Sequence, residues 1–248
     1  MPRPFAQHYD HLYVDKDYGS DIAALETLVG ADSLAGKRVL EIGAGTGNHT
    51  LRLASKVGEL VSIEIDADFA EVLRSKLEAD RPRNVAFFDC LLQSLPESNF
   101  DVAAAFFHVL NYMGPDQLEE FLGALAIRMK PGGHFVADVW NGSAAMLDPP
   151  REELREKQAA HIRVLQRIHP RLDLARRIVT LNYEIVLNDG ISTQNLNESI
   201  DLFLWFPEEL EAGLIRAGFS EVQFWDYRLF PAPAMPESWR LWVRAKRR

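Results

Sequence analysis

The sequence predicts an α/β fold in which a doubly wound parallel sheet carries an antiparallel β inset. Two observations support this prediction. Short apolar runs alternate with amphipathic segments over residues 38–140, as in a parallel sheet with helices on both faces. Three longer runs of strand character then follow between residues 148 and 206, with no helical segment between them.

Strands and helices are expected to alternate strictly within the first of these regions. The predicted strands are residues 38–44, 59–66, 84–90, 100–110 and 134–140. The predicted helices are residues 49–57, 67–79 and 115–130, the last ended by Pro131-Gly132-Gly133. Residues 100–110 are apolar almost throughout, which is typical of a strand covered on both faces.

The second half of the chain supplies the inset and closes the sheet. Residues 161–169, 176–187 and 192–206 have the pattern of three antiparallel strands, and Asn188-Asp189-Gly190 predicts a hairpin between the last two. Residues 207–219 have the pattern of a helix, with Pro207 at its start and Gly218 at its end. Two closing strands are expected at residues 221–227 and 238–246.

These patterns divide the chain into four parts. They are an N-terminal lid or helical segment (1–37), a cofactor-binding core (38–147), the antiparallel inset (148–206) and a C-terminal part of the core (207–248). The inset is expected either to wall a substrate pocket or to pair two chains as a homodimer through an exposed strand edge.

Composition excludes several classes of function. The 248 residues are 47% hydrophobic and 25% charged, which is typical of a globular protein. The single cysteine, Cys90, excludes an intrachain disulfide, and with no apolar export segment at the start we expect a cytoplasmic location. A net charge of −9 argues against a nucleic-acid partner. No apolar run approaches the roughly 20 residues of a membrane span.

A glycine-rich turn follows the first predicted strand in the stretch VLEIGAGTGNH, residues 39–49. Its glycines, Gly43, Gly45 and Gly47, are one residue short of the G-x-G-x-x-G spacing that binds a dinucleotide pyrophosphate. The acid Glu41 would also repel a pyrophosphate, whereas it suits the ammonium and sulfonium groups of S-adenosylmethionine. Glu64, which ends the second strand, could accept hydrogen bonds from a ribose diol in either ligand.

With these motifs, the sequence resembles the class I S-adenosylmethionine-dependent methyltransferases. VLEIGAGTGNHT, IEID, FFDCLLQSLP and MKPGGHFVADVW are similar to successive motifs of that family. The resemblance implies a Rossmann-like sheet of order 3-2-1-4-5-7-6 with the last strand antiparallel. It also implies cofactor contacts from residues at the strand ends and near the N-terminus: Tyr9, Tyr13, Tyr18, Glu41, Gly43, Ala44, Gly45, Gly47, Glu64, Ile65, Asp89, Cys90 and Phe107.

A narrower resemblance concerns small-molecule methyltransferases of the sugar and antibiotic type. YDHLYVDKDYGSD, FHVLNYM and the inset before WFPEELEAGLIRAGF resemble that subgroup, several members of which are associated with amino-sugar or surface-polysaccharide biosynthesis. In that group the N-terminal tyrosine-rich segment closes over the cofactor and the inset helps to wall the acceptor pocket. This chain departs from it after the fifth strand, where DVWNGSAAMLDPP lacks a Glu-Pro-Trp run.

The candidate catalytic residues follow the fourth strand. His108 could act as a general base for a hydroxyl acceptor, or it could pack against the adenine or the core. Asn111 and Tyr112 could orient an acceptor, or they could serve as a helix cap and a core aromatic residue. Asp138, inside the fifth strand, is expected to be a satisfied buried acid. The histidines have no metal-ligand spacing, so no metal site is predicted.

The sequence therefore predicts transfer of a methyl group from S-adenosylmethionine to a nitrogen or oxygen atom of a small molecule, with a sugar or amino sugar as one candidate. Two alternatives remain open at this stage. One is a protein that binds S-adenosylmethionine without transferring the methyl group. The other is an NAD-type oxidoreductase, which the glycine spacing and Glu41 disfavour.

Overall fold

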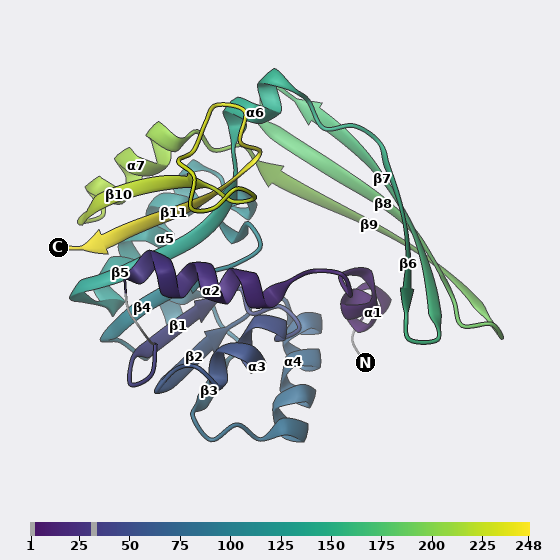
Figure 1. Ribbon diagram of the computed structural model, residues 1–248, viewed down its shortest axis with the longest axis horizontal. Coiled ribbons are helices and arrows are strands. Elements are labelled where there is room, and N and C mark those ends of the chain that lie inside the picture. The colour runs from purple at the N-terminus through teal and green to yellow at the C-terminus, as the bar shows by residue number, and fades with distance from the viewer. Residues whose placement is uncertain (1–2, 31–33) are drawn as a thin grey trace.

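A computed structural model describes residues 3–30 and 34–248, so residues 1–2 and 31–33 of the predicted N-terminal segment lie outside the described residues. In the described part, seven strands form a central sheet of order β10-β11-β5-β4-β1-β2-β3 (Figure 1). They are β1 (Arg38–Ile42), β2 (Glu59–Ile63), β3 (Val85–Phe88), β4 (Phe100–Ala105), β5 (Met129–Trp140), β10 (Phe219–Asp226) and β11 (Arg240–Arg247).

The order of the sheet confirms the predicted fold class. Strands β1 to β5 pair in parallel, and β11 runs antiparallel to both β5 and β10. With β10 and β11 counted as the sixth and seventh strands of the core, the order is the predicted 3-2-1-4-5-7-6. The last strand is antiparallel, as expected.

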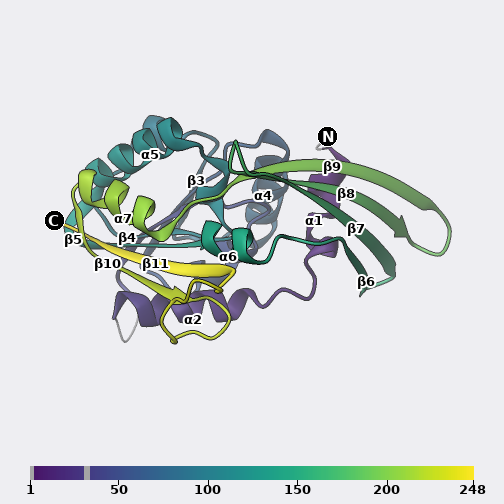
Figure 2. The ribbon, with the colours of Figure 1, turned by 90° about the horizontal axis from the view of Figure 1, so that it is seen from above.

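Helices cover both faces of this sheet (Figure 2). On one face lie α5 (Pro115–Arg128) and α7 (Pro207–Arg216), and on the other lie α2 (Tyr18–Val29) and α3 (Asn48–Ala54), while α4 (Ala67–Asp80) follows β2. Successive residues of β4 show the two faces directly. Ala103 belongs to the apolar cluster that contains α5 and α7, whereas Val102 and Ala104 belong to the cluster that contains α2 and α3. The apolar sequence of this strand thus reflects burial on both sides.

The two largest errors in the predicted boundaries are at the end of β4, which stops at Ala105 and not at residue 110, and at the start of β5. Helix α5 ends at Arg128, and β5 begins at Met129, ahead of the predicted turn at Pro131-Gly132-Gly133. Met129 is buried in the core and pairs with Phe100 of β4, so it already belongs to the sheet. The proline and glycines instead lie within an irregular start of β5, where the register to β4 shifts.

The inset is an antiparallel sheet of four strands in the described chain, not three (Figure 1). Its strands are β6 (Glu153–Ala159), β7 (Ile162–Asp173), β8 (Ile178–Asn188) and β9 (Thr193–Phe203), in sequence order. The predicted hairpin at residues 188–190 joins β8 to β9. Strand β6 was not predicted because its sequence, ELREKQA, is mostly charged. As an edge strand it needs little apolar surface.

Short elements connect the inset to the core. Helix α6 (Gly142–Leu147), which the sequence did not predict, follows β5 and is capped by the Asn141 side chain, which accepts a hydrogen bond from Ser143 N. The 3-10 turns η1 (Leu92–Ser94) and η2 (Val109–Tyr112) follow β3 and β4. Helix α1 (Pro4–Leu12) packs against α4 on the core and against β6, β7 and β9 of the inset (Figure 1).

Asn111 in η2 fixes the junction between core and inset. Its side-chain Nδ2 donates to Phe203 O of β9 at 2.8 Å and to Trp140 O at 3.4 Å, and its Oδ1 accepts from Trp140 N at 2.9 Å. Beside it, Trp205 Nε1 donates to the carbonyl oxygens of Leu110 and Met113. Asn111 is fully buried and its amide is committed to backbone groups, so the predicted role of orienting an acceptor is replaced by a structural one.

Replacing this asparagine should therefore destabilise the protein. Asn111→Ala leaves Trp140 N and Phe203 O buried without their partner, so we expect the free energy of unfolding to fall by about 2–4 kcal/mol. Asn195→Ala, at an exposed position of β9, is the matched control and should change it by less than about 0.5 kcal/mol. Urea denaturation followed by tryptophan fluorescence measures both. Equal stability of Asn111→Ala and wild type would contradict the structural role.

Candidate functional site

The glycine-rich turn after β1 presents bare backbone at the carboxyl edge of the sheet. Gly43 and Gly45 have φ of +70° and +57°, in the left-handed region that favours glycine. At Gly43 a Cβ would lie 2.6 Å from Val109 Cγ2, so a side chain there would collide with the turn after β4. At Gly45 a Cβ would meet nothing within 4 Å. The backbone at Gly45 is therefore open to a ligand.

Glu64, immediately after β2, faces this turn. Its Oε2 accepts from Gly45 N at 2.7 Å, and its Oε1 accepts from Ile65 N at 2.8 Å and Asp66 N at 2.9 Å. Burial raises the pKa of this carboxyl, while the backbone N–H donors oppose the shift. A carboxylate has about four acceptor positions, and three are used here. About one position remains for a ligand hydroxyl, fewer than the two that the sequence suggested.

Glu41 lies inside the core beneath the glycine-rich turn and not at the ligand-facing surface that the sequence predicted. It is buried on β1, and its Oε2 accepts hydrogen bonds from Thr50 Oγ1 at 2.6 Å and Ser62 Oγ at 2.7 Å. Burial raises its pKa to about 7, an effect that the two hydroxyl donors reduce. The carboxyl group thus ties α3 to β2 beneath the turn, instead of standing as a fully ionised group against a ligand.

The N-terminal segment lies over the glycine-rich turn and is held there by polar contacts. Asp10 of α1 accepts hydrogen bonds from Thr46 Oγ1 at 2.6 Å and from Asn48 Nδ2 at 2.8 Å. Arg3 pairs with Asp66 and Asp68 at the start of α4. These contacts join the N-terminal segment to the glycine-rich turn and to the start of α4, and neither Asp10 nor Arg3 was predicted to belong to the site.

The three predicted tyrosines divide into two groups. The rings of Tyr9 and Tyr13 lie 4.6 Å apart, and the ring of Tyr13 meets that of Phe107 edge-on at 5.0 Å. Tyr13 therefore covers the turn after β4, whereas Tyr9 beside it packs edge-on against Phe69 of α4 at 5.0 Å. Tyr18 starts α2, where its ring packs on His49 at 4.8 Å and its hydroxyl accepts from Asn48 Nδ2 at 3.3 Å.

The turn after β4 has an unusual backbone, which Asp138 holds in place. Phe107 and His108 have φ of +67° and +53°, although neither is glycine. The buried Asp138 carboxylate accepts from Phe107 N at 2.5 Å and His108 N at 2.9 Å, and also from Arg240 Nε at 2.6 Å. The prediction of a satisfied buried acid at Asp138 is confirmed.

His108 is a largely buried, neutral imidazole whose side chain is 12% exposed. Burial is the main cause that lowers its pKa to about 3, and the neighbouring Arg240 lowers it further. Its Nδ1 lies 3.8 Å from Asp138 Oδ2 and has no hydrogen-bond partner. Tyr112, four residues later, is 52% exposed. A histidine with so low a pKa is a weak general base at neutral pH but a competent hydrogen-bond acceptor.

The remaining predicted cofactor residues lie along the same edge of the sheet. Asp89 follows β3 and is exposed, with Arg74 at 3.6 Å. Cys90 packs partly buried against the core, and burial raises its thiol pKa. Ala44 is buried in the glycine-rich turn, whereas Ile65 is exposed beside Glu64. The structure thus brings the predicted residues of β1, β2, β3 and β4 to one edge.

A buried ionic network beside this edge was not predicted. Asp21 of α2 is fully buried, and its Oδ2 lies 2.5 Å from Lys16 Nζ and 2.8 Å from His49 Nε2. The guanidinium of Arg240 stacks 3.7 Å over the ring of Tyr227. These residues come from distant parts of the sequence, and no local pattern relates them.

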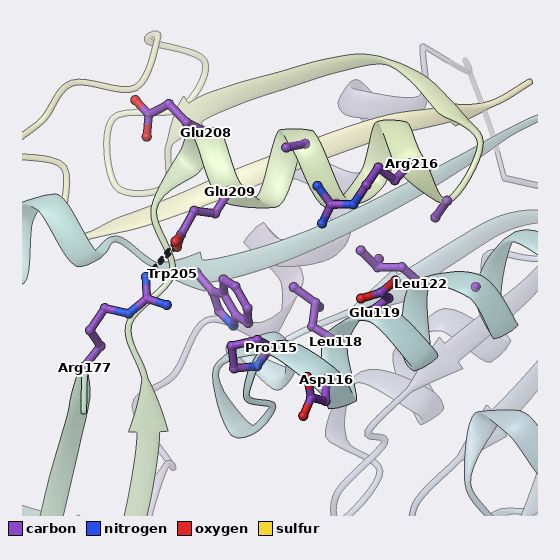
Figure 3. A pocket seen from close by; sticks show the side chains of 14 residues that line it. Pro115, Asp116, Leu118, Glu119, Leu122, Arg177, Trp205, Glu208, Glu209 and Arg216 are labelled. Carbon is purple, nitrogen blue, oxygen red and sulfur yellow. Dashed lines mark hydrogen bonds and ion pairs between the residues drawn. The ribbon is translucent and has the colours of Figure 1, made fainter. Parts of the chain in front are cut away.

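A separate cavity of about 670 Å³ lies between α5 and α7 (Figure 3). Arg177 and Glu209 form an ion pair of 2.7 Å at one end of it. It shares no lining residue with the glycine-rich turn, so it is distinct from the candidate site.

Across residues 3–30 and 34–248, no helix has the length and apolar character that crossing a membrane requires. The same residues contain no group of three or more side chains arranged to hold a metal ion.

Comparisons with known proteins agree with the geometry of this edge. Residues 39–133 match the family described as Methyltransferase domain. Phosphoethanolamine N-methyltransferase 1 of Triticum aestivum is 31% identical over 113 residues, which are 44% of this chain and 22% of that protein. The chain thus spans about a fifth of the length of that relative.

Solved structures share the fold over nearly the whole chain. An S-adenosylmethionine-dependent methyltransferase from Clostridium acetobutylicum ATCC 824 is 18% identical with a TM-score of 0.80, covering 98% of this chain and 97% of that one. CalS10, an S-adenosylmethionine-bound amino pentose methyltransferase of Micromonospora echinaspora involved in calicheamicin biosynthesis, is 17% identical with a TM-score of 0.76. It covers 97% of this chain and 96% of that one. The predicted resemblance is confirmed.

The buried Glu41 should make stability depend on pH. Because its pKa in the folded protein is about 7, above its ordinary value, the folded protein keeps a proton that the unfolded chain has already lost. This stabilisation is fully present below the unfolded pKa and is lost as pH rises toward 7. Glu41→Gln keeps an acceptor oxygen for the two hydroxyls. It should remove the part of the pH dependence of the free energy of unfolding that Glu41 causes.

Urea denaturation between about pH 4.5 and 8 tests this expectation, since the free energy of unfolding follows the protons bound in each state. The difference between wild type and Glu41→Gln should shrink or change sign as pH rises. Glu78→Gln, at an exposed position of α4, is the control and should follow wild type. A difference that does not change with pH would rule out a raised pKa at Glu41.

Proposed function

Residues 39–133 form a methyltransferase domain, and we propose that this chain uses it to transfer a methyl group from S-adenosylmethionine to a nitrogen atom of a small molecule. The observation that carries the proposal is the pairing of Glu64 with the open backbone at Gly45. The 2.7 Å contact between them places an unused carboxylate position beside space that no side chain occupies. That arrangement suits a ribose hydroxyl next to a ligand that lies against bare backbone.

The other proposed cofactor contacts follow from this position. Ile65, Asp89 and Cys90 lie at the ends of β2 and β3, where an adenine would extend from the ribose. Phe107 would lie on the other side of the ribose from the adenine, in the turn after β4. The ring of Tyr13 packs against it, and Tyr9 packs against Tyr13. The sulfonium methyl would then lie near this turn, and the tyrosines would exclude water from it.

We place the acceptor between the turn after β4, the end of β5 and the inset. His108 and Trp140 have ring centroids 5.6 Å apart at this position, and the half-exposed Tyr112 follows them. Tyr183 of β8 approaches from the inset and shares a side-chain hydrogen bond with Tyr13. An acceptor placed there would be enclosed by α1 and the inset, which favours a small molecule over a polymer, and the net charge of −9 is unfavourable for nucleic acid.

The reaction needs positioning more than acid–base help. The acceptor's lone pair attacks the methyl carbon in line, the carbon–sulfur bond breaks with its electrons going to sulfur, and the acceptor nitrogen later loses a proton. Correct alignment in such reactions contributes about 7–11 kcal/mol in favourable cases. The residues of this chain would hold the acceptor in line and keep water out.

The surroundings of His108 favour nitrogen over oxygen as the acceptor. The burial that lowers its pKa to about 3 also disfavours an ammonium group at the same place. An amine would therefore arrive unprotonated and nucleophilic. A hydroxyl would need a base of near-neutral pKa, which His108 is not. An amino sugar fits these conditions, and CalS10, an amino pentose methyltransferase, shares the fold.

Cofactor binding provides the first test. Wild type should bind S-adenosylhomocysteine, and Glu64→Gln should weaken that binding at least about tenfold, because the amide cannot reproduce all the hydrogen bonds of a carboxylate. Glu78→Gln on α4 should bind like wild type. Isothermal calorimetry with S-adenosylhomocysteine and, separately, NADH measures these affinities. Tight binding of NADH with none of S-adenosylhomocysteine would instead support the oxidoreductase alternative.

His108 provides the second test. If the neutral imidazole orients the acceptor, His108→Ala should lower methyl transfer by about 10–100-fold, with the affinity for S-adenosylhomocysteine nearly unchanged. The methyl-transfer rate of wild type should show no change from titration of His108 between about pH 5 and 8, since a pKa near 3 lies below that range. His161→Ala, at an exposed turn of the inset, is the control.

Transfer of labelled methyl from S-adenosylmethionine to small molecules of a cell extract, detected by mass spectrometry, gives the activity. A limb near pH 6–7 that His108→Ala removes would restore the general-base role. Collapse of cofactor affinity in His108→Ala would mean that the ring packs against the adenine instead. Binding of S-adenosylhomocysteine without any labelled product from wild type would favour a non-catalytic binding protein.

A further inference from the structure

Gln166 of β7 is a buried amide without a partner. The residue is fully buried, and neither its Nε2 nor its Oε1 has a hydrogen-bond partner. Burying an amide with both ends unpaired opposes folding, so a buried amide is normally satisfied by a protein group, by water or by a ligand. No step of the methyl transfer described above uses it.

The position of Gln166 in the inset is fixed by the strand register. It pairs with Arg155 of β6 on one side and with Ile185 of β8 on the other. Ile185 is buried in the apolar cluster that also contains Phe5 and Leu12 of α1. Residues directly opposite each other share one face of a sheet. Gln166 therefore lies on the inner face of the inset, the face that α1 covers.

On the inner face of the inset, the residues in the rows on either side of Gln166 contact the end of α1 and Tyr13. In the next row toward the core, Tyr183 shares its hydrogen bond with Tyr13. In the row on the other side, Lys157 Nζ donates to Leu12 O at 2.7 Å, at the end of α1. Successive rows on one face are about 7 Å apart. Gln166 thus lies beneath the end of α1, one row from the tyrosines of the proposed acceptor site.

A second buried polar atom without a partner belongs to His108, which is linked to Tyr183 through Phe107 and Tyr13. His108 Nδ1 is buried without a partner, and the His108 ring lies 4.6 Å from that of Phe107. Phe107 meets Tyr13, and Tyr13 meets Tyr183. Among the buried polar groups without partners, His108 Nδ1 and the Gln166 amide therefore flank one aromatic-lined region between the core and the inset.

We propose that Gln166 is a specificity-determining residue whose amide binds an uncharged polar group of the acceptor, a hydroxyl or an amide, while the reacting nitrogen lies near His108. This inference rests on the proposed function. An amide offers both a donor and an acceptor, which matches a group with the same pair. A charged group would lack a counter-charge there, because the neighbouring Arg155 is already paired through two hydrogen bonds with Glu153.

Gln166→Met tests the proposal, because methionine has a similar shape and no hydrogen-bonding amide. Kinetics of labelled methyl transfer should show a fall in kcat/KM for the acceptor of about tenfold or more. The affinity for S-adenosylhomocysteine should stay at the wild-type value, and the free energy of unfolding should be equal or higher. Gln223→Met, at an exposed position of β10, is the matched control. Gln166→Leu serves as a second variant if the first does not fold.

The outcomes separate this proposal from the proposed function. If wild type forms a labelled product and Gln166→Met forms it equally well, Gln166 is satisfied by water and the inference is wrong while the function stands. If kcat/KM falls together with cofactor affinity or stability, Gln166 has only a structural role, and the inference is also wrong. If wild type forms no product at all, the proposed function fails and the inference fails with it.

Discussion

The carboxylate of Asp138 is the constraint on which the arrangement of the site depends. It lies within β5, fully buried, and it receives backbone hydrogen bonds from Phe107 and His108 and the guanidinium of Arg240. Left-handed backbone at non-glycine residues costs about 1–2 kcal/mol each, so this turn needs such support. Because the turn is fixed, the Phe107 ring meets Tyr13 of the N-terminal segment and the His108 ring lies beside Trp140. Asp138 therefore acts through backbone geometry and not through chemistry of its own.

The carboxyl edge of the sheet contains two buried acids whose surroundings give them different roles. Glu41 is bound by two hydroxyl groups inside the core, and its raised pKa shows how little its ionised form is stabilised. Glu64 accepts three backbone N–H groups, which favour its ionised form and orient it toward Gly45. One acid therefore ties α3 to β2, and the other is held by backbone groups beside the open backbone at Gly45.

The inset and helix α1 of the N-terminal segment pack against each other. Helix α1 packs on α4 and on three inset strands. Arg3, just before the helix, pairs with Asp66, and Lys157 Nζ donates a hydrogen bond to Leu12 O at its end. Asn111 and Trp205 meanwhile hold the base of the inset to the core through hydrogen bonds to backbone. Helix α1 is held both by its polar contacts and by the apolar packing of Phe5 and Leu12, which lie in the same buried cluster as the inset strands.

Local patterns in the sequence were enough to predict the sheet, the hairpin, the glycine-rich turn and the placement of Glu64. Each depends on residues close together in the chain: alternating periods, turn residues, or an acid at a strand end. The charged strand β6, the structural role of Asn111, the burial of Gln166 and the partners of Asp21 and Asp138 could not be predicted in this way. Asp138 meets Arg240 from 102 positions away, and Asn111 meets Phe203 from 92. Which polar groups meet inside the protein is decided only when the sheet, the lid and the inset pack together, because burial determines whether each group must find a partner.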